Sequence, residues 1–166
     1  MLATIGYEGA RLEDFLATLK AVDVDMVVDI RDRAQSRRAG FSKTALSEAL
    51  ATQGIDYLHL KDLGDPKPGR EAARAGDFDQ FRAIYRKVMA GSSAKAAMTQ
   101  VVELLNGRSV CLLCYERDHH TCHRKLVADH IESVVGLKAR HLGVNANVAT
   151  SGFAGRVRDP RQSASA

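Results

Sequence analysis

All three cysteines of this chain lie within residues 111–126, CLLCYERDHHTCHRKL, together with three of its six histidines. Thr121 can cap a helix that starts there, which would place Cys122, His123 and Arg124 in the first helical turn. The free backbone N–H groups of such a turn carry partial positive charge. Cys122 would lie beside these N–H groups and next to a histidine and an arginine. A cysteine in such surroundings is expected to have a lowered pKa. The sequence therefore predicts a thiol with thiolate character.

The same segment offers further groups for chemistry. Cys114 is a second candidate nucleophile, and Glu116 can act as a general acid or base where its surroundings are dry. His123 would tune the thiol of Cys122. Arg124 and the open N–H groups would hold an anion such as phosphate. We therefore predict a Cys/Glu/His/Arg site.

A zinc site is an alternative for this segment, with Cys111, Cys114, Cys122 and His123 as ligands. Two observations weigh against it. Cys111 and Cys114 point to opposite faces of one strand, and the adjacent Cys122 and His123 are awkward ligands for one tetrahedral ion. We predict no cofactor; zinc or iron would be the metal if this set bound one.

A third interpretation treats the cysteines as small buried hydrophobic residues. Cys111 fits it best, because the run SVCLLC (109–114) is strongly apolar. The chemistry would then belong to Glu116, Asp29 and Arg124.

The elements that must position these residues follow from hydrophobic periodicity. The predicted strands are 3–7, 25–30, 55–60, 109–114 and 137–142. The predicted helices lie within 11–22, 42–54, 77–89, 96–105 and 122–135. Strands separated by helices predict an α/β domain over residues 1–142, a three-layer sandwich with a mainly parallel sheet of about five strands.

Two segments fall outside this alternation. Residues 64–77, GDPKPGREAARAGD, are polar and rich in proline and glycine, which predicts a long loop that could serve as a lid. Residues 143–166 lack periodicity and are rich in small residues, which predicts a flexible basic C-terminal tail.

Reactive groups follow several of the predicted strands. In an open parallel sheet the ligand crevice lies outside the carboxyl ends of the strands. Asp29 joins Glu116 there as an acid–base candidate, although Asp29 and Arg31 could instead form a structural ion pair. The binding candidates at this edge are Tyr7, Glu8, Arg31 and His59.

Positive charge is concentrated in residues 31–43, RDRAQSRRAGFSK, in a chain of net charge +4 and pI near 9.1. Such a cluster suits phosphate or nucleic acid, so Arg37, Arg38 and Lys43 are added to the substrate-binding candidates. The alternative is a solvated basic loop.

The sequence also bounds the compartment. No apolar stretch approaches the roughly 20 residues of a membrane helix, so no membrane partner is expected. The start, MLATIGYEG, lacks the basic flank and long apolar core of a signal peptide. Three cysteines do not form a disulfide framework. We therefore expect a cytoplasmic protein.

Three functions compete. The first is a hydrolase- or transferase-like enzyme acting on a phosphate-bearing substrate, with a nucleotide or nucleic acid as the preferred class. The second is a nucleic-acid-binding module without chemistry, and the third is a thiol-redox or metal-binding protein. The sequence does not indicate an oligomeric state.

Motifs along most of the chain resemble family four-eight-eight of the domains of unknown function (DUF488). They are TIGYEG (4–9), VVDIR (27–31), SRR (36–38), GFSK (40–43), GIDYLHLKDLG (54–64), the signature Cys114-x-Glu116…Cys122-His123-Arg124, and HLG (141–143). Many relatives begin TIG-H-S where this chain has Tyr7 and Glu8. The resemblance implies a compact α/β domain and marks the same residues; it names no reaction.

Overall fold

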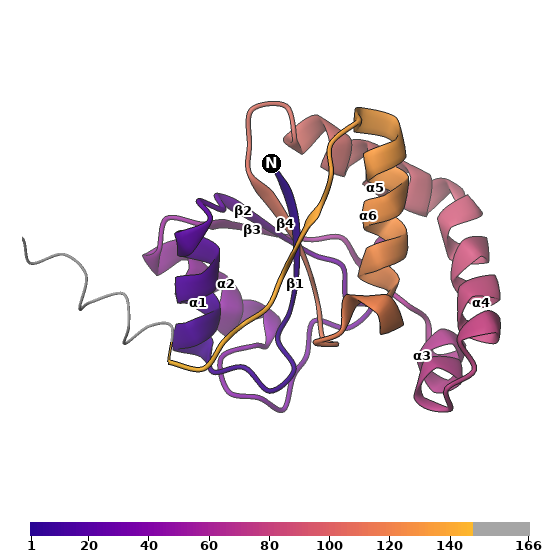
Figure 1. Ribbon diagram of the computed structural model, residues 1–166, viewed down its shortest axis with the longest axis horizontal. Helices are drawn as coiled ribbons and strands as arrows, with labels where there is room; N and C mark the ends of the chain where they lie inside the picture. The colour runs from indigo at the N-terminus through magenta and orange to yellow at the C-terminus, as the bar shows by residue number, and fades with distance from the viewer. Residues whose placement is uncertain (148–166) are drawn as a thin grey trace, which may run out of the picture.

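The computed structural model describes residues 1–147, the part of the chain drawn in colour in Figure 1. Its strands form one five-stranded sheet in the order β3-β2-β4-β1-β5, and every neighbouring pair is parallel. The strands are β1 (Leu2–Gly6), β2 (Met26–Asp29), β3 (Asp56–His59), β4 (Val110–Cys114) and β5 (Arg140–Leu142). The predicted α/β class with a parallel sheet is confirmed.

Helices cover both faces of this sheet and complete the predicted three layers (Figure 1). On one face lie α1 (Leu12–Ala21) and α2 (Lys43–Thr52). On the other lie α3 (Lys67–Arg74), α4 (Phe78–Ala90), α5 (Ser92–Leu104) and α6 (His123–Val135). Short 3₁₀ turns, η1 (Lys61–Leu63) and η2 (His119–Thr121), precede α3 and α6.

Each face of the sheet has its own buried core, because successive side chains of a strand point to opposite faces. In β2, Val27 packs with the α1 and α2 side, whereas Val28 packs with the side of α3 to α6. Strands buried on both faces explain the near-continuous apolar runs in the sequence.

Residues 64–77 contain a helix, so the prediction of a plain loop there was wrong. Pro68 falls in the first turn of α3, where the missing N–H of proline is not needed. Gly69 and Ala72 are buried against the rest of the protein. The segment is therefore a packed wall beside the sheet edge and not a free lid.

No helix among residues 1–147 is long and apolar enough to cross a membrane. The predicted basic tail, 143–166, lies largely outside the described residues, which end at Asn147.

Candidate active site

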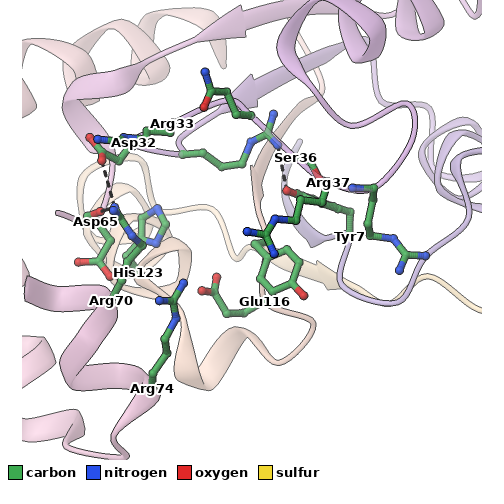
Figure 2. Close-up of a pocket in the computed structure, with 14 residues that line it drawn as sticks. Tyr7, Asp32, Arg33, Ser36, Arg37, Asp65, Arg70, Arg74, Glu116 and His123 are labelled. Atoms are coloured by element: carbon green, nitrogen blue, oxygen red, sulfur yellow. Dashed lines mark hydrogen bonds and ion pairs between the residues drawn. The ribbon is translucent and has the colours of Figure 1, made fainter. Parts of the chain in front are cut away.

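A pocket of about 570 Å³ opens at the carboxyl ends of the strands (Figure 2). Its walls come from the turns after β1, β2 and β4, from Asp65 and α3, and from the start of α6. Six arginines line it: Arg31, Arg33, Arg37, Arg38, Arg70 and Arg74. Three carboxylates share it: Asp32, Asp65 and Glu116. The pocket is therefore rich in positive charge but retains acidic groups.

The structure divides the predicted site residues into two groups. Those that line the pocket are Tyr7, Arg31, Arg37, Arg38, Glu116 and His123. Those that do not line it are Glu8, Asp29, Lys43, His59, Cys114, Cys122 and Arg124. Lys43 and His59 border a neighbouring hollow of about 420 Å³, which shares Arg33 with the pocket.

Asp29 and Arg31 form a buried ion pair. Nε and Nη2 of Arg31 donate to the two carboxylate oxygens of Asp29 at 2.9 and 2.6 Å. The hydroxyl of Tyr57 donates to the same carboxylate at 2.6 Å. Asp29 is fully buried, so the structure places it as a support for Arg31 and not as an acid or base facing substrate.

Arg31 in turn supports the aromatic wall of the pocket. Its Nη1 donates to the hydroxyl of Tyr7 at 3.0 Å and to the carbonyl of Phe41 at 2.8 Å. The ring of Tyr7 stacks on Phe41 at 4.5 Å, and Tyr115 meets Tyr7 edge-on at 5.3 Å. Nε2 of His59 donates to the carbonyl of Arg31 at 2.7 Å, and this bond fixes the turn after β2.

Arg124 is 1% exposed and is not among the residues that line the pocket. All three of its guanidinium nitrogens donate to protein acceptors. Nε donates to the hydroxyl of Thr4, Nη1 to Sγ of Cys114 and the carbonyl of Glu116, and Nη2 to the carbonyl of Arg117. The prediction that Arg124 binds phosphate is corrected: its donors are used to hold the turn that carries Glu116.

Cys122, and not Thr121, is the N-cap of α6, because Thr121 belongs to the 3₁₀ turn η2. The Sγ of Cys122 accepts from the backbone N–H of Arg124 at 3.5 Å. The thiol is only 2% exposed. Burial, the hydrogen bond with Cys114 and the nearby Glu116 raise its pKa well above the ordinary value and outweigh Arg124. The predicted lowering of this pKa was therefore wrong.

His123 has a defined protonation pattern. Its Nε2 lies 2.8 Å from the carbonyl of Ile30, which can only accept, so Nε2 carries the hydrogen. Burial lowers the pKa of the ring, so the ring is neutral near pH 7 and its Nδ1 is an acceptor. Nδ1 lies 3.6 Å from Sγ of Cys122, and the thiol is therefore the donor.

Glu116 sits at the floor of the pocket. Burial alone would raise its pKa, but the neighbouring His123 and the hydrogen bond from the Cys114 thiol hold it below the usual range. Sγ of Cys114 donates to Oε2 of Glu116 at 3.3 Å. Glu116 is thus an ionised carboxylate at neutral pH, and the Cys114 thiol fixes its position.

Two groups of donor atoms among residues 1–147 could hold a metal ion: an exposed set, Asp118, His119 and His120, and the set at the site, Cys114, Glu116 and Cys122. The donor atoms of each set lie within 4.8 Å of one another. Thiolates with a carboxylate would suit zinc or iron. However, Nη1 of Arg124 lies 2.9 Å from Sγ of Cys114, so a permanent positive charge already occupies that neighbourhood. Cys111 lies on the other face of the sheet, in the core with α1 and α2, so the predicted four-ligand set is split.

Glu8 is hydrogen-bonded to the turn after β4, which carries Glu116. Its carboxylate accepts from the backbone N–H of Arg117 at 3.0 Å, and its own N–H donates to the carbonyl of Tyr115 at 2.8 Å. Glu8 therefore orients the turn after β4 and does not itself line the pocket.

Two glycines allow these elements to approach closely. A Cβ on Gly6 would overlap the carbonyl oxygen of Glu116, and a Cβ on Gly64 would overlap the backbone of Asp32. Any larger residue at either position would push the pocket wall outward. The site thus depends on backbone contacts between strand ends.

Sequence reasoning missed several pocket residues. Asp65, Arg70 and Arg74 come from the 64–77 segment, and Tyr115 lies between two residues that were singled out. The sequence did contain one signal for Asp65: it follows Gly64 shortly after the third strand ends, and the ends of the other strands also carry site residues. The loop prediction for 64–77 concealed it.

The family resemblance is supported by comparison with known proteins. A family model described as the domain of unknown function DUF488 matches residues 11–131, which is well over half of the chain. No curated protein and no solved structure matches the chain.

Proposed function

The chain belongs to the DUF488 family, and we propose that this member is an enzyme that acts on a phosphate-bearing substrate, a nucleotide or a nucleic acid, in the arginine-lined pocket. One observation carries the proposal. Arg33, Arg37 and Arg74 line the same pocket as Glu116, and none of the three has a side-chain partner among residues 1–147. Unpaired guanidinium groups around one hollow suit the oxygens of a phosphate.

The charge balance favours an anionic ligand. Six arginines face three carboxylates in the pocket lining. Arg31 is neutralised by Asp29, and Arg70 is paired with Asp32 at 3.0 Å. Arg38 donates twice to the carbonyl of Ala10. The arginines that remain for a ligand are the three without an internal partner, and together they can offer a phosphate several charge-assisted hydrogen bonds.

The catalytic part of the proposal rests on Glu116. An ionised carboxylate at the floor of a partly dry pocket can take a proton from an attacking water or hydroxyl group. The neutral ring of His123 borders the same floor, with Nε2 bonded to the carbonyl of Ile30 and Nδ1 to the thiol of Cys122. Cys114 donates to Glu116, and Cys122 donates to the neighbouring His123. We assign these two thiols to orienting Glu116 and His123.

The aromatic wall favours a substrate with a flat ring. Tyr115 is 45% exposed and lines the pocket, which is unusual for a large side chain that also packs edge-on against Tyr7. Stacking on tyrosine is a common way to hold a nucleobase. A nucleotide would place its base on Tyr115 and its phosphate among the unpaired arginines.

Calorimetry with inorganic phosphate and then with nucleotides tests the binding part. Arg37→Gln and Arg74→Gln should each weaken phosphate affinity about tenfold, the cost of one charge-assisted hydrogen bond. Arg86→Gln is the control, because Arg86 is exposed on α4 and outside the pocket. Equal phosphate affinities in all three variants would show that phosphate does not bind in this pocket.

A nucleic-acid-binding module without chemistry is the second candidate. It is favoured by the basic segment 31–43, which supplies four of the pocket arginines. Oligonucleotide binding that falls steeply with salt but survives Glu116→Gln, with no product formed by the unaltered protein, would select this alternative. We also propose a cytoplasmic location, where the three free cysteines would stay reduced.

A further inference from the structure

Asp65 is a buried carboxylate in the pocket that lacks a full set of partners. It lies between η1 and α3, is 6% exposed and lines the pocket (Figure 2). Its Oδ1 has no hydrogen-bond partner, and it is the sole side-chain atom of that kind among the described residues. Buried carboxylate oxygens are normally hydrogen-bonded. An unpaired oxygen that is shielded from water and packed against Gly69 favours the protonated, uncharged form of the carboxyl group.

The chain is shaped to hold Asp65 in this position. A Cβ on Gly69 would overlap Oδ1 of Asp65, so only glycine lets the backbone of α3 approach the carboxylate. Glycine inside a helix lowers helix stability. Asp65 does not cap α3, whose N-cap is Pro66 without a side-chain bond. Helix capping therefore does not explain the buried carboxylate.

The groups around Asp65 come from every neighbouring element. Glu116 approaches from the turn after β4, Asp32 from the turn after β2, Arg70 from α3 and Tyr85 from α4. Nη1 of Arg70 donates to Asp32 and to the backbone carbonyl of Asp65, so its charge is shared. Burial, then the charge of Glu116, raises the pKa of Asp65 to about 7 against the opposing effect of Arg70.

We infer that Asp65 is the proton donor to the leaving group of a phosphate ester bound in this pocket, opposite the carboxylate of Glu116. This inference rests on the proposed function. The two carboxylates then have different roles because their surroundings push their protonation in opposite directions. Asp65 is held as an acid, and Glu116 as a base.

The hydrolytic step balances with these two residues and one water. Glu116 takes a proton from the attacking water, and the water oxygen forms the new bond to phosphorus. The bond from phosphorus to the leaving oxygen breaks, and that oxygen takes the proton of Asp65. Asp65 ends as a carboxylate and Glu116 as an acid. Proton exchange with solvent restores both groups for the next turnover.

Carboxyl ¹³C NMR on the full chain tests the protonation of Asp65, with Asp65→Asn used to assign its signal. We expect a titration midpoint near 7 for Asp65, whereas an exposed aspartate titrates near 3.9. Asp62, which is exposed on η1, is the internal reference. A midpoint of Asp65 near 4 would overturn the inference without touching the proposed anion pocket.

Sulfate binding tests whether a filled pocket engages Asp65, because sulfate does not titrate near pH 7. Calorimetry in two buffers of different ionisation enthalpy should show uptake of roughly half a proton per sulfate at pH 7. Asp65→Asn should abolish the uptake, and Asp62→Asn should retain it. Sulfate binding without Asp65-dependent uptake would overturn the inference alone, and absence of sulfate binding would overturn the proposed function together with it.

Turnover tests the catalytic role directly. A panel of nucleoside mono-, di- and triphosphates is assayed for phosphate release. Asp65→Asn should lose about 10² to 10⁴ in kcat, and the fall in wild-type rate as the pH rises above about 7 should disappear. Asp62→Asn should match the wild type. A rate for Asp65→Asn within twofold of the wild type, with its pH profile unchanged, would overturn the inference.

Discussion

Nη1 of Arg124 donates a 2.9 Å hydrogen bond to Sγ of Cys114, which ties the first turn of α6 to the end of β4. The same guanidinium group holds the carbonyls of Glu116 and Arg117. The buried side chain of Arg124 therefore fixes the conformation of the turn that places Glu116 in the pocket. The guanidinium group of Arg124 stabilises the fold, although its position in the first turn of a helix is one where arginines often bind anions.

Replacing Arg124 should unfold this turn. Arg124→Met removes donors from buried carbonyl oxygens and from a buried thiol, so we expect a loss of about 3 kcal/mol or more in unfolding free energy. Urea denaturation measures it. The control is Lys125→Ala, which removes a partly exposed ion pair with Asp129 and should cost less than about 1 kcal/mol. Equal unfolding free energies of the two variants would contradict the role of Arg124 in stabilising this turn.

A methyl group at position 6 should displace Glu116. Gly6→Ala places a Cβ against the carbonyl oxygen of Glu116, so we expect about 1 to 3 kcal/mol of destabilisation together with weaker phosphate binding. Gly143→Ala is the matched control, because nothing lies within 4 Å of a Cβ there. Thermal unfolding and calorimetry report the two effects. Full phosphate affinity in Gly6→Ala would show that the close approach is dispensable.

The thiols should be unreactive in the folded protein. All three cysteines are buried, and burial, aided at Cys122 by its acidic neighbours, raises the pKa of both Cys111 and Cys122. We expect reaction with an aromatic disulfide reagent at pH 7.5 to be roughly 100-fold slower than for a free thiol. In strong denaturant all three should react rapidly. One rapidly modified thiol in the native protein would revive the nucleophile interpretation.

The raised pKa of Asp65 predicts a pH-dependent stability. In the folded state the group keeps its proton up to about pH 7, whereas the unfolded chain releases it near pH 3.8. Its contribution to stability is therefore complete below pH 3.8 and is lost as the pH rises through 7. Asp65→Asn should be more stable than the wild type at pH 8.5, by on the order of 1 kcal/mol, and the gain should shrink towards pH 5.

Urea denaturation at a series of pH values measures this difference. Asp62→Asn is the control, since an exposed carboxylate should show no comparable gain. A gain of the same size at pH 5 and pH 8.5 would mean that Asp65 does not titrate between them.

Periodicity was enough to predict most of the fold, because the signal is repeated along each element. Val27 and Val28 must both be buried, and a strand with helices on either side is the arrangement that does so. The exception was α3, whose sequence KPGREAAR contains Pro68 and Gly69. Pro68 is compatible with a first helical turn, but Gly69 weakens a helix, and the reason for glycine there, its contact with Asp65, is visible only in the packed structure.

Roles of single residues were harder to predict than their convergence on one sheet edge. Asp29 and Arg124 were proposed to contact substrate, yet both are buried and satisfied by other protein groups. Cys122 lies at a helix start, where local rules lower a thiol pKa, but burial outweighs them. Burial and partner distances depend on segments far apart in the chain, which a local motif does not contain.

By itself, the sequence determined that parallel strands would bring Tyr7, Arg31 and Glu116 to one edge, since the direction of each strand follows from the helices between them. The tertiary structure alone decided which charges remain free there. Arg31 is neutralised by Asp29, whereas Arg74 stays unpaired among the described residues, and Oδ1 of Asp65 is shielded from water. The free energy of a charge depends on its neighbours in space and its hydration, and both are set only when the chain has packed.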